Sequence, residues 1–258
     1  MIGWLESLPT SFAGIVIVGG VLALALFIGY VVSRFTSAEV RTAHNDRAGF
    51  IIAVIGVVYA VLLAFVAIGV WERFQQAESR SYEEAGAVAT VYRDADSFPH
   101  PAQLRSVLRA YVRSVIGVEW PQMERGQRSH VSNLLLENAD RQVRALPADS
   151  PRLANIQAQM LQAMDTALDD REARLTIYSG GINGIIWLVL IAGAIVTIAF
   201  TYFFGFDRTL IQQLMIGALT FLIALVLFLI VALDYPFRGG IAVQPDAFRA
   251  LLEAFGGS

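Results

Sequence analysis

Few side chains in this chain have the types and spacing that catalysis or metal binding requires. Cysteine is absent, and the three histidines, His44, His100 and His130, stand far apart in the sequence. None of them has a second histidine at the short spacing with which one helix holds a metal ion. We therefore expect no enzyme, no metal site and no cofactor, and the absence of cysteine excludes disulfides and thiol catalysis.

One polar motif immediately precedes a long apolar stretch that begins at Phe50. It consists of His44, Asn45 and Asp46, followed by Arg47. Either Asn45 or Asp46 could accept hydrogen bonds from unpaired amides at a helix start, which makes the motif an N-cap. The same residues could instead form a polar rim or an ion site at the mouth of a pore, and both interpretations stay open.

A second polar motif follows the last apolar stretch. It contains Asp234, Pro236 and Phe237, and two glycines come soon after. Proline and glycine stop a helix and turn the chain. A carboxylate is tolerable where a membrane helix meets water, and an aromatic side chain anchors well at headgroup level. We expect a turn at the membrane surface.

The apolar stretch that begins at Phe50 has two different helical faces. At 100° per residue, small side chains gather on one face and bulky ones on the opposite face. Small residues let helices approach closely in lipid, so the first face is expected to pack against other helices. The bulky face could line a hydrophobic constriction in a ring of subunits, or simply touch lipid. The helix-packing candidates are Gly56, Ala60 and Ala64, and the pore-lining candidates are Ile55, Tyr59, Leu62 and Val66.

Four such apolar stretches position these residues. They cover about residues 13–32, 50–70, 182–203 and 210–233, and none contains Asp, Glu, Lys, Arg or His. About 20 apolar residues in a helix span the hydrocarbon core of a bilayer. Composition agrees, with 56% apolar and 16% charged residues, and the net charge of -3 argues against a nucleic-acid partner. We predict an all-α, multi-pass protein of the bacterial inner (plasma) membrane.

The order of these stretches predicts the domain organisation. Residues 1–72 would form a first transmembrane hairpin, 73–178 a helical extramembrane domain, 179–236 a second hairpin and 237–258 a C-terminal tail. Within the middle domain, apolar residues recur at helical spacing between 104 and 116, and Pro151 starts a second amphipathic run. The row Arg105, Arg109 and Arg113 could attract anions or simply face water beside nearby acids.

Two functions fit this organisation. Pumps and proton-coupled carriers need ionisable groups at membrane depth, and the four stretches have none. An oligomeric ion channel is therefore one hypothesis, with inorganic ions and the lipid bilayer as partners. The alternative is a non-conducting envelope protein whose helical middle acts as an interaction or sensing module. The short loops that carry Arg34, Arg41, Arg47 and Arg208 indicate a cytoplasmic side for those loops, and the opposite side for the middle domain.

The motifs taken together resemble a known family. The segments are residues 44–46 with 49–50, residues 56–65, Trp71 to Phe74, and Leu233 to Gly239. In these segments, and over nearly the whole chain, the sequence resembles bacterial bestrophin-like membrane proteins of unknown function. Kinship to true bestrophins implies a homopentameric ion channel whose second span lines a hydrophobic neck, and by helix position this neck comprises Ile55, Tyr59, Leu62 and Val66. That kinship also implies a cytoplasmic middle domain, contrary to the charge pattern. The calcium-binding acidic run of bestrophins is reduced here to Asp246 and Glu253.

Overall fold

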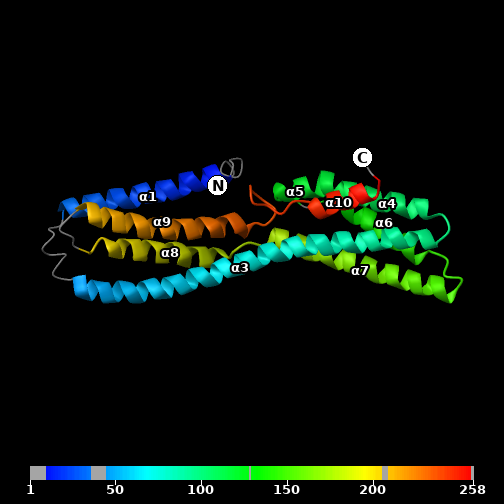
Figure 1. Ribbon diagram of the computed structural model, residues 1–258, viewed down its shortest axis with the longest axis horizontal. Coiled ribbons are helices and arrows are strands. Elements are labelled where there is room, and N and C mark those ends of the chain that lie inside the picture. The colour runs from blue at the N-terminus through cyan, green and yellow to red at the C-terminus, as the bar shows by residue number, and fades with distance from the viewer. Residues whose placement is uncertain (1–9, 36–44, 128, 205–208, 257–258) are drawn as a thin grey trace. The chain divides into compact units, whose positions relative to one another are not determined.

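The computed structural model describes residues 10–35, 45–127, 129–204 and 209–256, and within these ranges every regular element is a helix (Figure 1). The all-α prediction is confirmed for this part of the chain. The chain divides into two compact units. Unit 1 comprises Met1–Glu72 and Gly181–Asp234, and unit 2 comprises Arg73–Gly180 and Tyr235–Ser258.

Unit 1 contains four helices long and apolar enough to cross a membrane. Their best windows have a mean hydropathy of 2.4 to 3.0, yet only 11% to 28% of the residues in these windows are buried inside the protein. Such exposure of apolar side chains is expected when lipid is the solvent, and the chain is a membrane protein. The helices are α1 (Thr10–Phe35), the first part of α3 (Asn45–Asp94), α8 (Gly184–Thr201) and α9 (Thr209–Asp234).

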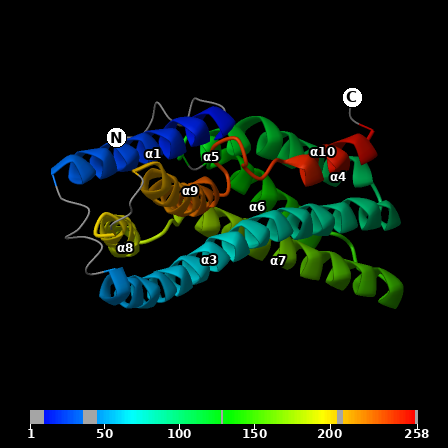
Figure 2. The ribbon, with the colours of Figure 1, turned by 60° about the vertical axis from the view of Figure 1, so that its left-hand side comes forward.

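Within unit 1 the helices lie in the order α1, α9, α8 and α3 (Figures 1 and 2). The structure does not confirm the expected first hairpin, since the main packing partner of α1 among the described helices is α9. Glycines explain this choice of neighbour: a methyl group at Gly14 would lie 2.8 Å from the Phe228 ring, and one at Gly29 would lie 2.9 Å from Ile216. Close approach of backbones selects partners in lipid, where chain order alone does not.

Unit 2 is built from the rest of α3 and the shorter helices that follow. Their boundaries agree with sequence signals: the chain breaks after Phe98, His100 adopts a left-handed conformation with φ of 58°, and Pro101 opens the next helix. At Ser150 the hydroxyl accepts a hydrogen bond from the Leu153 amide at 3.2 Å and caps the long helix that follows. The elements are η1 (Ala95–Ser97), α4 (Pro101–Ser114), the π-helical turn η2 (Val115–Glu119), α5 (Trp120–Glu124), α6 (Val131–Arg144), α7 (Pro151–Ser179) and α10 (Asp246–Ala254).

The core of unit 2 is a single apolar cluster contributed by all of its long helices. The tail belongs to this core, since Phe237 and Phe248 are buried and pack at an angle against the Trp120 ring. The Trp120 indole donates a hydrogen bond to the Val243 carbonyl at 3.0 Å. These contacts fix the tail to α5.

Candidate functional site

The membrane part of α3 turns one face toward the other helices of unit 1. Tyr59 is buried there, and its hydroxyl donates a hydrogen bond to the Leu190 carbonyl of α8 at 3.0 Å. The ring lies directly over Gly193, where a methyl group would come within 2.5 Å of two ring carbons. Tyr59 thus faces its own chain, while the other pore-lining candidates, Ile55, Leu62 and Val66, are half-buried beside it.

The opposite side of α3 is exposed in the single chain and carries bulky apolar residues at alternating spacings of four and three. We call this set the open face; its side chains are between 50% and 72% exposed. Beside it, the helix-packing candidates Ala60 and Ala64 are also exposed, and Gly56 has no atom within 4 Å of the position of a side chain. The open face consists of Val54, Val58, Val61, Phe65 and Ile68.

The polar motif before α3 is only partly described. His44 lies outside the described residues, and for Asp46 only the helical backbone is given. Asn45 is the first residue of α3 and is half-buried. The cap and pore-mouth interpretations of this motif both remain predictions.

The carboxylate of Asp234 is buried at the end of α9 and accepts hydrogen bonds from residues at and just before the start of α8. One oxygen accepts a hydrogen bond from the Ile182 amide at 2.7 Å, and the other accepts one from the Trp187 indole at 3.4 Å. Asn183 caps the same helix through the Ile185 amide. In the turn that follows, Pro236 and Phe237 are buried, and the Val243 amide donates to the Pro236 carbonyl at 2.7 Å.

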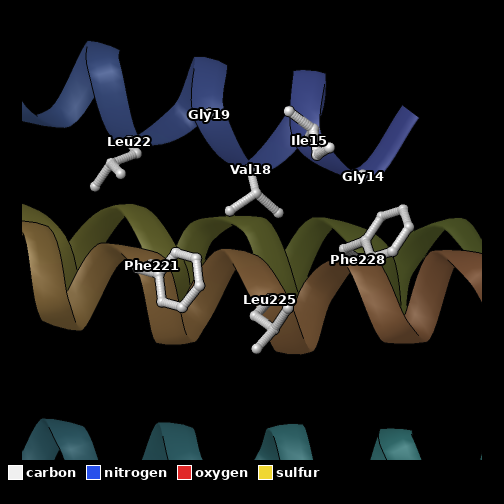
Figure 3. Close-up of a pocket in the computed structure, with 8 residues that line it drawn as sticks. All are labelled: Gly14, Ile15, Val18, Gly19, Leu22, Phe221, Leu225 and Phe228. Atoms are coloured by element: carbon white, nitrogen blue, oxygen red, sulfur yellow. The ribbon is translucent and has the colours of Figure 1, made fainter. Parts of the chain in front are cut away.

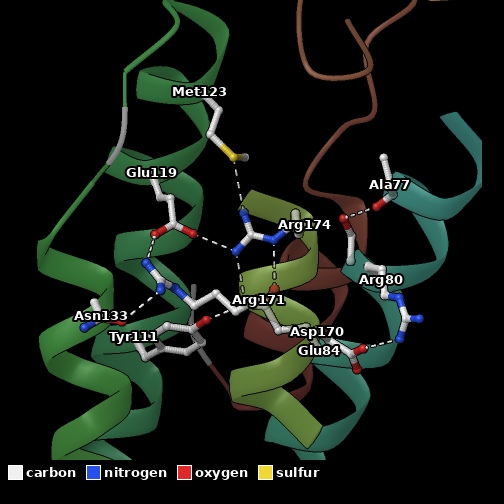
Figure 4. Close-up of polar contacts among 11 residues, drawn as sticks. Ala77, Arg80, Glu84, Tyr111, Glu119, Met123, Asn133, Asp170, Arg171 and Arg174 are labelled. Atoms are coloured by element: carbon white, nitrogen blue, oxygen red, sulfur yellow. Dashed lines mark hydrogen bonds and ion pairs between the residues drawn. The ribbon is translucent and has the colours of Figure 1, made fainter. Parts of the chain in front are cut away.

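Unit 2 holds a cluster of buried charges that we call the ion cluster. Arg174 of α7 is completely buried and donates to both oxygens of Glu84, at 2.8 and 3.1 Å, and to Glu119 at 2.6 Å (Figure 4). Arg171 binds the other oxygen of Glu119 at 2.6 Å. The Tyr111 hydroxyl donates to Glu84. Two cations and two anions balance one another, and α3, α4, η2 and α7 are joined by these contacts.

The two carboxylates of the ion cluster differ in their electrostatic surroundings. Burial raises the pKa of Glu84, and Arg174 with the Tyr111 hydroxyl only partly offsets this effect. Burial acts in the same direction on Glu119, but the charges and hydrogen bonds of Arg174 and Arg171 outweigh it and lower the pKa. Burial would lower the pKa of Arg174, yet the two carboxylates raise it above its ordinary value. Arg174 therefore stays charged.

Sequence reasoning missed the ion cluster, although a signal was present. Arg171 and Arg174 are three residues apart on α7, which places both on one helical face. Glu119 ends the π-helical turn η2, a rare element that often marks special sites. By contrast, the predicted row on α4 has a plain explanation: Arg105 pairs with Asp96 and Arg109 donates to the Tyr92 hydroxyl.

An apolar groove of about 390 Å³ runs between α1 and α9 (Figure 3). Val18 points into it from α1, and Phe221, Leu225 and Phe228 point into it from α9. Every lining side chain is hydrocarbon, so the groove offers no group for proton transfer, nucleophilic attack or ion binding.

Comparison with known proteins relates this architecture to other chains. A crystal structure of a bacterial bestrophin homologue from Klebsiella pneumoniae superposes with a TM-score of 0.67 at 14% identity, covering 92% of this chain and 99% of that one. A variant of that homologue gives a TM-score of 0.70 at 13% identity, with 92% and 98% covered. At these identities the similarity concerns the fold. No curated protein matches the chain.

The sequence itself decides the family. The model of the bestrophin-like domain matches residues 19–248, which is most of the chain and includes both polar motifs, the second apolar stretch and the ion cluster. The chain therefore belongs to the bestrophin-like family.

Proposed function

We propose that the chain assembles into an oligomeric channel that passes inorganic ions across the bacterial inner membrane along the open face of α3. The observation that carries this proposal is the open face itself. It presents a continuous row of apolar side chains that no helix in the described part of the chain covers. The bestrophin resemblance implies a homopentamer, in which five copies of such a row would surround an axis.

The proposed passage is a hydrophobic neck. Residues 48–71 of α3 include no Asp, Glu, Lys, Arg or His, so ions would meet hydrocarbon over the length of the span. Apolar constrictions gate by dewetting, since water leaves a narrow hydrocarbon tube and returns when the tube widens. Such a neck needs no charged switch at membrane depth.

In this proposal the faces of α3 have different roles. Tyr59 is held by α8 of its own chain, so it fixes the rotation of α3. Ala60 and Ala64 lie next to the open face and would pack closely against the adjacent subunit. In this proposal the pore lining is the open face and not the face of α3 that carries Tyr59. The half-buried Leu62 lies at the edge of the open face.

Purified protein reconstituted into planar bilayers tests the proposal. Unitary currents are expected, and Phe65→Ala should change the unitary conductance because it widens the neck. Ile195→Ala is the matched control, since Ile195 is exposed to a similar degree on α8. Imaging of the same preparation should show rings with an axial passage. Silent bilayers that contain intact rings would exclude the channel and favour the non-conducting module.

A further inference from the structure

Two arginines of unit 2 differ from all others in the described part of the chain. Arg73 and Arg238 are partly buried, yet neither has a carboxylate within 4.0 Å or any side-chain hydrogen bond there. The other partly or fully buried arginines with described side chains all have such partners, as Arg105, Arg171 and Arg174 do. Burying part of a guanidinium without a partner costs free energy, so the missing partner requires an explanation.

Both guanidinium groups lie against the last turn of α7. Arg238 lies over the Tyr178 ring, with 5.7 Å from its central carbon to the ring centre, and over the Tyr235 ring at 4.9 Å. Arg73 lies 3.9 Å from the position that a side chain would occupy at Gly180. The negative end of the α7 dipole favours cations at this place. No helix carbonyl in the described chain accepts a hydrogen bond from either guanidinium, however, and a buried nitrogen of each has no partner among the described residues.

The backbone makes room for Arg238. Gly126 has a φ of 77°, and a methyl group there would lie 2.8 Å from a terminal nitrogen of Arg238. A larger residue at this position would displace the guanidinium from the two tyrosine rings.

Sequence position puts these residues at the membrane surface. Arg73 follows the apolar residues 48–71 after one intervening residue, Glu72, and Tyr235 and Arg238 lie one and four residues beyond the end of α9 at Asp234. Arginine and tyrosine at the ends of spans lie at the depth of lipid headgroups. There the available anion is the headgroup phosphate, and the planar guanidinium matches phosphate oxygens in a bidentate manner.

We propose that Arg73 and Arg238 form a binding site for a phosphate group at the membrane surface, occupied by the headgroup of an anionic lipid. The two tyrosine rings hold the Arg238 guanidinium in place by cation–π contact. Free inorganic phosphate shares the same chemistry, and a lipid titration combined with a phosphate titration distinguishes the two sources.

Delipidated protein in detergent, in phosphate-free buffer, is titrated with phosphatidylglycerol, and bound lipid is counted by native mass spectrometry. An arginine near a lipid surface contributes about 1 kcal/mol, so Arg73→Gln and Arg238→Gln should each weaken binding about fivefold. Phosphatidylcholine is the comparison lipid, and Arg113→Gln is the control, because Arg113 is exposed on α4. The Arg238→Lys variant keeps the charge and should lose less affinity than the glutamine variant.

A second arm adds inorganic phosphate to the wild type and measures the unfolding midpoint. Phosphatidylglycerol binding that falls in both glutamine variants supports the lipid site. A midpoint that rises with free phosphate in the wild type alone, without phosphatidylglycerol preference, would support the same site with a soluble anion. Equal lipid affinity and equal phosphate response in wild type, Arg73→Gln and Arg238→Gln, all eluting as assembled protein, would overturn the proposal.

Discussion

Replacing Arg174 with methionine removes the cation that two buried carboxylates share. Arg174, Glu84 and Glu119 have no exposed side-chain surface, and the arginine makes three ion-pair contacts of 2.6 to 3.1 Å. Methionine fills much of the same volume but leaves Glu84 without a counter-charge and Glu119 with Arg171 alone. Removing one partner of a buried pair costs about 3–5 kcal/mol.

This cost converts into a large thermal shift. For a chain of this size, 1 kcal/mol corresponds to about 2–4 °C, so Arg174→Met should lower the unfolding midpoint by about 6–20 °C. Intrinsic fluorescence in detergent reports the transition directly, because Trp120 lies 4.9 Å from the Arg174 guanidinium. The matched control is Arg144→Met, whose arginine pairs with Asp140 at the surface. Arg144 is 55% exposed, so water screens its charge and the midpoint should change much less.

The cause of the loss is open to a second check. Adding Glu84→Gln to Arg174→Met removes the stranded charge, so the double variant should regain part of the lost midpoint. If Arg174→Met unfolds at the same temperature as Arg144→Met, or if the second substitution lowers the midpoint further, the ion cluster does not stabilise unit 2 through its buried charges.

Three further predictions concern single contacts and use the same unfolding midpoint. Gly193→Ala should destabilise the protein by about 1–3 kcal/mol because its methyl group meets the Tyr59 ring. Gly184→Ala is the control and should not be destabilising, because open space surrounds Gly184. Equal midpoints for the two variants would contradict the packing of Tyr59 on Gly193. The lowered pKa of Glu119 means that its ion pairs stabilise the fold above pH 4.5 and are lost as pH falls through the folded value. The wild-type midpoint should therefore fall toward that of Glu119→Gln below pH 4.5, and a constant difference would refute this. Asp234→Ala should lower the midpoint more than Asp234→Asn, which keeps an acceptor for the Ile182 amide just before α8. The reverse order would contradict a stabilising role of this hydrogen bond.

The fold class was predictable because hydrocarbon length and helical periodicity are local properties. Four stretches without charges specify four spans, and Pro151 marks a helix start that the structure confirms. Which spans adjoin is a different matter. It depends on contacts such as Gly14 with Phe228, whose residues are more than 200 positions apart and carry no mutual signal in one sequence.

The packing partner of each α3 face was also not predictable from one sequence. Periodicity separates small from bulky residues, but it does not say which side meets the chain's own helices. Tyr59 turns inward because Gly193 leaves space for its ring and Leu190 offers a carbonyl. The ion cluster escaped prediction for a related reason: charged residues usually face water, and only the fold brings Glu84 and Arg174, 90 positions apart, together in the core.

Cysteine accessibility along α3 tests the central claim most directly. The natural chain has no cysteine, so a thiol introduced at one position is the only target for a charged methanethiosulfonate reagent. We expect the reagent to alter currents of reconstituted Val61→Cys and Phe65→Cys channels, and to leave Leu63→Cys unaffected because Leu63 is buried within its own chain. Currents that respond only at Leu63, or at no position of α3, would contradict an ion passage along the open face.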